Sequence, residues 1–200
     1  MHEIKSGYTR VSQILSVIPS KIGKDSVSGQ PIFGFPMRDI PVHVLSRKAE
    51  IGTRVHQAIS MSHEEEFFPL ANSEKGYYKS YQVWQKAVDL IPNKTELRLY
   101  HDALKLTGCV DMIGVMEGSS LPFLIDFKTA IAEDRAKWPI QAAFYHMLLA
   151  QEGYAVSDKA IFVILDREGG MPKICMYQTG KSLTTAAISA YNLYHYLTEK

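Results

Sequence analysis

The runs LTGCVDMIGVM (residues 106–116) and PFLIDFKT (122–129) stand on either side of the short segment EGSSL (117–121). Both runs are apolar and rich in the β-branched and aromatic residues that strands favour, and a Gly-Ser pair between two such runs is typical of a hairpin turn. We therefore predict an antiparallel hairpin. Each strand carries one aspartate in an apolar context, Asp111 in the first and Asp126 in the second.

The register of this hairpin decides whether the two aspartates meet. If Gly118 and Ser119 form a two-residue loop, Asp111 stands directly opposite Asp126. A loop of odd length would place the two aspartates on opposite faces, because a one-residue slip turns every side chain of a strand over. A shared site therefore requires an even-length loop.

The triplet Asp126-Phe127-Lys128 puts a carboxylate and an ammonium group on one face of its strand and an aromatic ring on the other. These charges follow Leu124 and Ile125, where the pattern predicts core, and such conflicts tend to mark functional sites. Two neighbouring carboxylates repel unless a cation compensates them, and oxygen ligands suit Mg²⁺ or Mn²⁺. Such an ion activates water for phosphodiester hydrolysis, and Lys128 would orient that water or stabilise charge developing on the phosphate.

Two helical spacings bring further polar groups toward this pair. Gly52-x-x-x-His56 lets a helix approach the sheet, so that His56 can serve as a third metal ligand. Gln141-x-x-x-Tyr145 sets an amide and a phenol on one helix face, where both can hydrogen-bond phosphate oxygens. The alternatives are a histidine satisfied in the core or at the surface, a tyrosine used only for packing, and aspartates paired with lysines on a solvated hairpin face.

Arg135, Lys137 and Trp138 lie between the second hairpin strand and the helix that carries Gln141. They bring positive charge and an aromatic surface to the same edge, as a channel for single-stranded DNA would need. An ordinary solvated loop is the alternative.

The rest of the chain alternates between helical and strand-like patterns, which indicates an α/β fold with a short central mixed sheet flanked by helices. The stretch 20–41 is rich in Gly, Pro and Ser and is predicted to be a loop. We expect one domain over 1–200, with a lead-in at 1–41, a core at 42–178 and a C-terminal helix at 179–200. The predicted helices are 8–15, 42–61, 77–91, 139–151 and 182–197, and the further strands are 95–100, 159–166 and 172–178.

Composition points to a soluble intracellular protein. A chain of 200 residues with 46% hydrophobic and 22% charged residues can bury one core. No apolar run approaches the roughly 18 residues that span a bilayer, and the N-terminus resembles neither a signal nor a transit peptide, so we expect no membrane contact and a cytoplasmic setting, bacterial or phage-encoded. A net charge of +1 argues against a DNA-coating protein, so any DNA contact must be local.

Taken in order, the motifs resemble the RecB-like branch of the PD-(D/E)XK nuclease superfamily. They run from residue 52 to residue 145, about half of the chain, and the opening segment 8–15 is similar to the lead-in of the mitochondrial genome maintenance exonuclease and of phage exonucleases. The resemblance is carried by Gly52-x-x-x-His56, Glu96, Gly108-x-x-Asp111, Asp126-x-Lys128 and Gln141-x-x-x-Tyr145.

This resemblance implies a restriction-endonuclease-like core of order αβββαβ, preceded by N-terminal helices. It implies that Asp111 and Asp126 are metal ligands together with His56, and that Lys128 is the catalytic lysine. It assigns Glu96 to the first strand of the site, where many relatives carry an acid whose role varies. Gln141 and Tyr145 would position the DNA or the active site.

The function expected from the residues and the resemblance is a Mg²⁺- or Mn²⁺-dependent exonuclease acting on single-stranded or duplex DNA ends, in DNA repair or recombination. Some relatives hold an iron–sulfur cluster through four cysteines, but Cys109 and Cys175 are the only cysteines here, which excludes that cluster and predicts two small buried hydrophobes. Strand separation would come from replication or recombination partner proteins. A structure-selective or nicking endonuclease is the alternative enzyme, and a non-catalytic DNA-binding protein of the same fold is the alternative outside enzymes.

Overall fold

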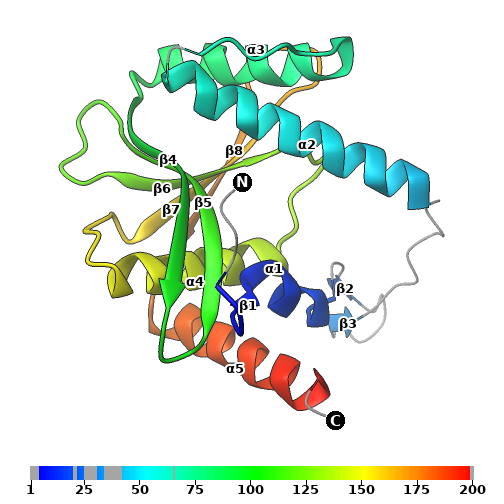
Figure 1. Ribbon diagram of the computed structural model, residues 1–200, viewed down its shortest axis with the longest axis vertical. Helices are drawn as coiled ribbons and strands as arrows, with labels where there is room; N and C mark the ends of the chain where they lie inside the picture. Colours follow the sequence, from blue (N-terminus) through cyan, green and yellow to red (C-terminus); the bar gives the residue numbers. More distant parts are fainter. Residues whose placement is uncertain (1–4, 20–21, 25–30, 34–41, 65, 199–200) are drawn as a thin grey trace.

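The computed structural model describes residues 5–19, 22–24, 31–33, 42–64 and 66–198. A mixed sheet lies between two layers of helices (Figure 1). The N-terminal elements are β1 (Thr9–Arg10), α1 (Val11–Ile14), the 3-10 turn η1 (Leu15–Val17), β2 (Ile22–Lys24), β3 (Pro31–Phe33), α2 (Val42–His63) and α3 (Asn72–Ala87). The remaining elements are β4 (Ile91–His101), β5 (Leu106–Val115), β6 (Phe123–Lys128), α4 (Lys137–Gln151), β7 (Lys159–Ile164), β8 (Lys173–Gln178) and α5 (Lys181–Thr198).

Strand β5 has three partners in the six-stranded sheet. It pairs along its length with β4, and its other edge is shared by β1 at its start and β6 near its end. The sheet then continues from β6 to β7 and β8, with β6 and β7 parallel and the neighbouring pairs antiparallel. From α2 to β7, leaving α3 aside, the order is helix, three strands, helix, strand. The α/β class and the flanked mixed sheet expected from the sequence are therefore confirmed.

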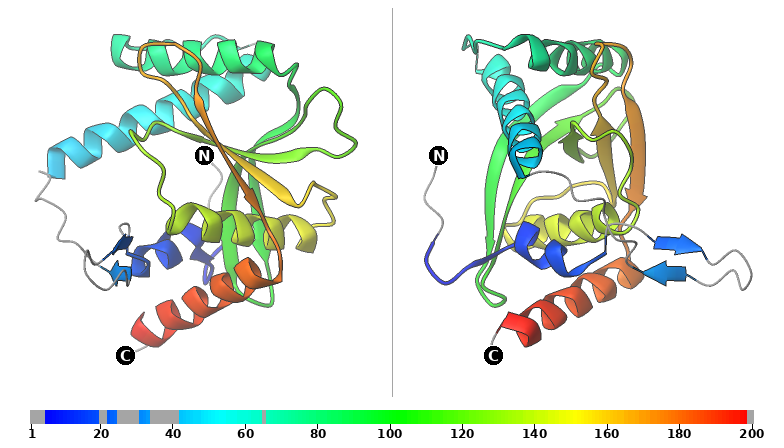
Figure 2. Two further views of the ribbon diagram at one scale, coloured as in Figure 1. Left: turned by 180° about the vertical axis from the view of Figure 1, so that it is seen from behind. Right: turned by 90° about the vertical axis from the view of Figure 1, so that its right-hand side faces the viewer.

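The sheet separates two apolar clusters. Figure 2 shows the sheet and the helices on its two faces from two further directions. Helices α1, α4 and α5 cover one face, where Phe144, Leu148 and Phe162 are fully buried. Helices α2 and α3 cover the other face, where Tyr81 and Trp84 pack edge-to-face against Phe127. Phe127 therefore points away from the charges beside it, as the strand alternation predicts.

Local signals explain how α4 begins and ends. Pro139 lies in its first turn, where a missing N–H costs nothing. Gly153, with φ of 78°, follows the helix, and the Tyr154 N–H returns to the Leu149 carbonyl at 2.9 Å. Such a left-handed C-terminal stop favours glycine. The start of β7 follows six residues after Gly153, so α4 forms a crossover that brings β7 beside β6.

Three expectations need correction. Helix α3 runs from Asn72 to Ala87 rather than over 77–91, because the Glu74 carboxylate accepts the Ala71 N–H at 2.8 Å and starts the helix early. The helix predicted at 8–15 begins only at Val11, after the short strand β1, and continues through η1 to Val17. The predicted loop at 20–41 lies largely outside the described residues, but its described parts, β2 and β3, pair with each other as a hairpin.

Candidate active site

The register of β5 and β6 is the one that an even-length connection requires. Met112 pairs with Ile125 and Ile113 with Leu124, so the same register continued by one step sets Asp111 opposite Asp126. The Asp111 side chain also forms a hydrogen bond with the backbone of β6, in which its Oδ2 accepts the Phe127 N–H at 2.8 Å. The last pair joins Gly114 to Phe123, so the connection between the paired residues is longer than the predicted two-residue loop. The number of residues in this connection is nevertheless even, as the shared face requires.

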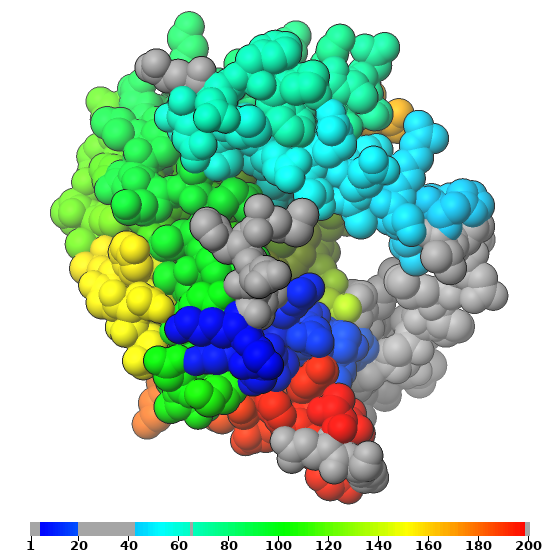
Figure 3. Space-filling view, in the orientation of Figure 1, coloured from blue at the N-terminus to red at the C-terminus, as the bar shows by residue number. Residues whose placement is uncertain are grey.

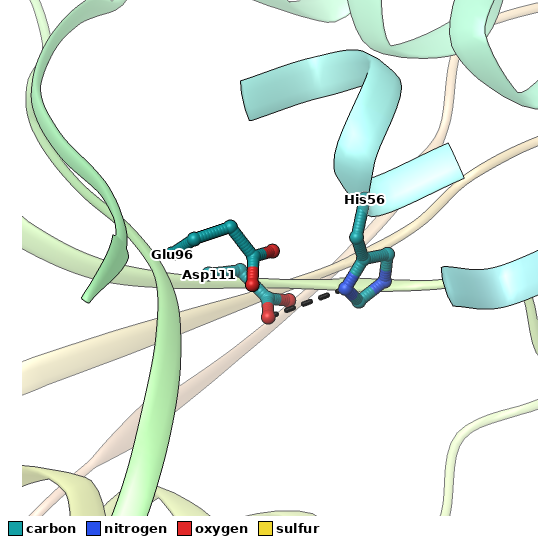
Figure 4. Close-up of side chains that lie close together, drawn as sticks. All are labelled: His56, Glu96 and Asp111. Carbon is teal, nitrogen blue, oxygen red and sulfur yellow. Dashed lines mark ion pairs between the residues drawn. The ribbon is translucent and has the colours of Figure 1, made fainter. Parts of the chain in front are cut away.

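His56, Glu96 and Asp111 form a cluster of possible metal ligands (Figure 4). One ligand atom from each lies within 4.8 Å of the others. The imidazole descends from α2, and its Nδ1 lies 3.2 Å from Asp111 Oδ1. Gly52, one turn earlier, lets α2 come close to the end of β6, since a Cβ there would stand 3.3 Å from Thr129 Oγ1. The predicted approach of His56 to Asp111 is therefore observed.

Glu96 reaches this cluster through an unusual backbone. The pairs on either side, Thr95 with Met112 and Leu97 with Val110, place it opposite Asp111 on β4. Its φ is 47°, which is rare for a residue with a side chain and tends to occur where function fixes the geometry. The Cys109 thiol donates to Glu96 Oε2 at 3.5 Å. The carboxylate is therefore held toward Asp111 although solvent reaches it.

Asp126 and Lys128 form the second half of the site. Asp126 is 2% exposed, and its Oδ2 lies 2.5 Å from the Lys128 ammonium. Gln141 on α4 links both groups, since its amide donates to Asp126 Oδ1 at 3.0 Å and its carbonyl accepts from Lys128 at 3.2 Å. The same amide nitrogen lies 3.0 Å from the Tyr145 hydroxyl. Gln141 and Tyr145 are 9% and 8% exposed, so they orient the aspartate and lysine rather than present donors to solvent.

Three of the ionisable groups of the site, Asp126, Asp111 and His56, have strongly perturbed environments and displaced pKa values. Burial raises the pKa of Asp126 to about 6; the Lys128 ammonium opposes this shift and the Asp111 charge reinforces it. Burial also disfavours charge on Asp111, but the facing imidazole, together with Lys128, holds the pKa of Asp111 below its ordinary value. For His56, burial alone would lower the pKa, yet Asp111 and then Asp126 raise it to about 9. Displaced titrations of this kind cluster at functional sites.

The chemistry of these side chains fits a divalent cation. Asp126 Oδ2 is buried and, apart from its close approach to the ammonium, has no hydrogen-bond partner of proper geometry among the described residues. A buried carboxylate oxygen without a hydrogen bond is costly unless a cation neutralises it. Asp111 and Glu96 offer hard oxygen ligands and His56 offers one nitrogen, a set that suits Mn²⁺ and is compatible with Mg²⁺, whereas the predicted ligand Asp126 is not among the three side chains whose ligand atoms converge.

Four other expectations have mixed outcomes. Trp138 is only 6% exposed and its ring stacks on Phe162, so the expectation that it offers a face to DNA bases is wrong. Arg135 is well exposed but pairs with Glu133 at 3.2 Å, and Lys137 begins α4. Cys175 is buried as expected, whereas Cys109 is half-buried and bonds a carboxylate instead of packing as a hydrophobe.

The sequence did not reveal the contact of Asp111 with the β6 backbone or the bridging role of Gln141. Both depend on the strand pairing and on the docking of α4. The period of four between Gln141 and Tyr145 was the available signal, since it predicts that they share one helix face but neither their mutual hydrogen bond nor their burial.

The sequence matches no family model and no curated protein. Among solved structures, a crystal structure of SSO0001 aligns over 98% of this chain and 79% of its own, at 11% identity and a TM-score of 0.43. A likeness this distant says nothing about activity. Within the part of the chain that the structure describes, no helix is long and apolar enough to cross a membrane.

Proposed function

We propose that this chain is a metal-dependent DNA exonuclease with a restriction-endonuclease-like core of the RecB-like PD-(D/E)XK branch. One observation carries the proposal: Asp111 and Asp126 lie on adjacent strands with Lys128 beside them and His56 descending from α2. A retired site would have little reason to keep a buried carboxylate and an ammonium group in contact within a core strand.

Asp111, Asp126 and His56 would hold Mg²⁺ or Mn²⁺, and Glu96 is close enough to complete the set. When bound, the metal supplies a Lewis acid that polarises the scissile phosphate and promotes ionisation of the attacking water. In the hydrolysis, the water oxygen bonds to phosphorus while the ester P–O bond breaks, and the departing oxygen takes up a proton. Lys128 stabilises the negative charge that grows on the phosphate in this step.

The remaining residues keep the catalytic groups in place. Gln141 fixes Asp126 and Lys128 relative to each other, since it bonds both. Tyr145 in turn fixes the amide of Gln141. The Phe127 N–H holds Asp111 at the end of the paired part of the hairpin. Each of these groups is a positioning residue.

The test is digestion of end-labelled linear DNA, single-stranded and duplex, with Mg²⁺, Mn²⁺ or a chelator. We expect metal-dependent release of nucleotides or short oligonucleotides by the wild type and loss of at least a hundredfold in rate for Lys128→Ala, as for loss of a group that stabilises transition-state charge. The matched control is Lys159→Ala, an exposed lysine at the opposite end of the parallel pair β6–β7. Full activity of Lys128→Ala would contradict the proposal.

Circular DNA separates an exonuclease from an endonuclease. A circular single strand has no ends, so the proposed enzyme leaves it intact under conditions that degrade the linear form of the same sequence. Cleavage of the circle at a comparable rate would assign the site to an endonuclease. Metal binding without hydrolysis of any of these DNAs would show that the chain is not a nuclease.

A further inference from the structure

A basic pocket of about 430 Å³ lies between the first half of α2 and the start of α3, near the turn that follows β7. We call it the α2–α3 pocket. Its lining includes no carboxylate, and none of its cationic side chains forms an ion pair with a residue that the structure describes. Its polar lining residues are His43, Arg47, Lys48, Ser73, Tyr77 and Arg167.

The walls of the pocket are held rigidly together. Arg54 on α2 contacts the buried Glu74 on α3 at 2.8 Å, and Glu74 also caps the start of α3. The turn carrying Arg167 lies directly on α3, since a Cβ on Gly76 would stand 1.6 Å from the Arg167 carbonyl oxygen. In Figure 2, the orange turn after β7 passes beside α3. The arginine backbone is therefore fixed before any ligand binds, which lowers the entropic cost of binding.

The chemistry of the α2–α3 pocket suits a phosphate group. Guanidinium groups bind phosphate oxygens with paired hydrogen bonds, an ammonium adds a point charge, and hydroxyls supply further donors. The whole chain has a net charge of only +1, so three cations around one pocket form a local concentration of charge. Figure 3 shows α2 and α3 together forming one end of the molecule.

The pocket also has a defined relation to the candidate active site. Arg47 precedes His56 by nine residues on the same helix, about 13 Å along the axis. Arg167 follows two residues after Leu165, whose N–H donates to the Lys128 carbonyl at 2.8 Å. The pocket faces α3, whereas His56 faces the sheet, so a group in the pocket is not the group at the catalytic lysine.

We propose that the α2–α3 pocket binds a phosphate of the nucleic-acid strand outside the scissile bond, and so holds the substrate while the end is processed. This inference rests on the proposed nuclease function. It adds a substrate contact that Asp111, Asp126 and Lys128 do not provide. Backbone phosphate contacts of this kind supply affinity and register but no sequence preference.

The test measures DNA binding apart from cleavage. Fluorescence anisotropy follows a labelled dT20 oligonucleotide in chelator, at 50 to 300 mM KCl, with the wild type and with Arg47→Glu/Arg167→Glu. The matched control is Lys159→Glu/Lys181→Glu, which changes the net charge equally at two exposed positions away from the pocket. The milder Arg47→Gln/Arg167→Gln variant and thermal melting of all proteins guard against loss of folding.

We expect the pocket variant to weaken binding at least tenfold and to reduce the slope of log affinity against log salt by about 1 to 2, as for the loss of two phosphate contacts on a single strand. The control should weaken binding less than threefold. Oligonucleotides with 5′-phosphate, 3′-phosphate or hydroxyl ends identify the source: an internal phosphate gives equal losses for all, whereas a terminal phosphate gives a loss confined to one end.

Equal binding by the pocket and control variants would overturn the inference, even if the wild type digests DNA. Absence of DNA binding by the wild type would overturn it as well. If binding depends on the pocket but no DNA is hydrolysed with any metal, the pocket stands and the proposed nuclease activity fails.

Discussion

Replacing Asp126 with asparagine should stabilise the metal-free protein at neutral pH while abolishing activity. The pKa of Asp126 rises from an ordinary 3.8 to about 6, chiefly through burial. The folded state therefore holds this proton more tightly than the unfolded state, so the contribution of Asp126 to stability is greatest below pH 4 and is lost as pH rises through 6. This rise in the pKa corresponds to a cost of about 3 kcal/mol in folding free energy when Asp126 is charged at pH 7. Asparagine is a neutral side chain of the same shape and avoids that cost.

The assay is thermal and urea unfolding of wild type and Asp126→Asn in chelator at pH 4.5 and pH 7. We expect the variant to melt about 6–12 °C higher at pH 7, the shift that about 3 kcal/mol produces in a chain of this size, and to lose most of that advantage at pH 4.5. Glu117→Gln, an exposed acid in the connection between β5 and β6, is the control and should change neither value. A variant that is less stable at pH 7, or equally stabilised at both pH values, would refute the reasoning.

Three further outcomes follow from individual contacts. His56 keeps its proton up to about pH 9, and Mn²⁺ must displace that proton to bind the imidazole. The Mn²⁺ affinity measured by calorimetry should therefore rise about tenfold per pH unit between pH 7 and 8.5, whereas His56→Ala should bind Mn²⁺ weakly and with an affinity that does not depend on pH. Gly76→Ala should lower the free energy of unfolding by about 2–4 kcal/mol in urea titrations, because its Cβ meets a backbone carbonyl, whereas Gly180→Ala, in open space, should not. Tyr145→Phe removes the hydroxyl that accepts the Gln141 amide, so steady-state digestion should show kcat reduced several-fold with KM unchanged. The melting temperature should stay within a few degrees of wild type, and an unchanged kcat would show that the hydroxyl has no positioning role.

Much of the architecture follows from short-range patterns in the sequence. Alternation along β5 and β6 leaves only two choices, the two aspartates on the same face or on opposite faces, and an even-length connection gives the first. Helical spacing likewise predicts that Gln141 and Tyr145 share one face of their helix, where the structure shows them hydrogen-bonded. These features depend on periods of two and about four residues, which a sequence displays directly.

The features that the sequence did not reveal arise from contacts between distant segments. Nothing around Trp138, which follows charged residues, indicates that its ring packs on Phe162 in the core. The left-handed backbone at Glu96 lies within the pairing of β4 with β5, and glutamate has no local preference for that conformation. The α2–α3 pocket combines Arg47 with Arg167, residues that meet only after β7 has docked beside β6.

The three carboxylates of the candidate site come from three consecutive strands, β4, β5 and β6, each paired with the next. Pairings between consecutive strands close short loops and cost little chain entropy, so they favour early formation during folding. His56 belongs to α2 and reaches the carboxylates only when that helix docks. The three carboxylates thus come together before His56 is in place to offset their negative charge. Their mutual repulsion raises the free-energy barrier to folding. Stopped-flow refolding should therefore be faster at pH 5 than at pH 7.5, a difference that Asp126→Asn should reduce.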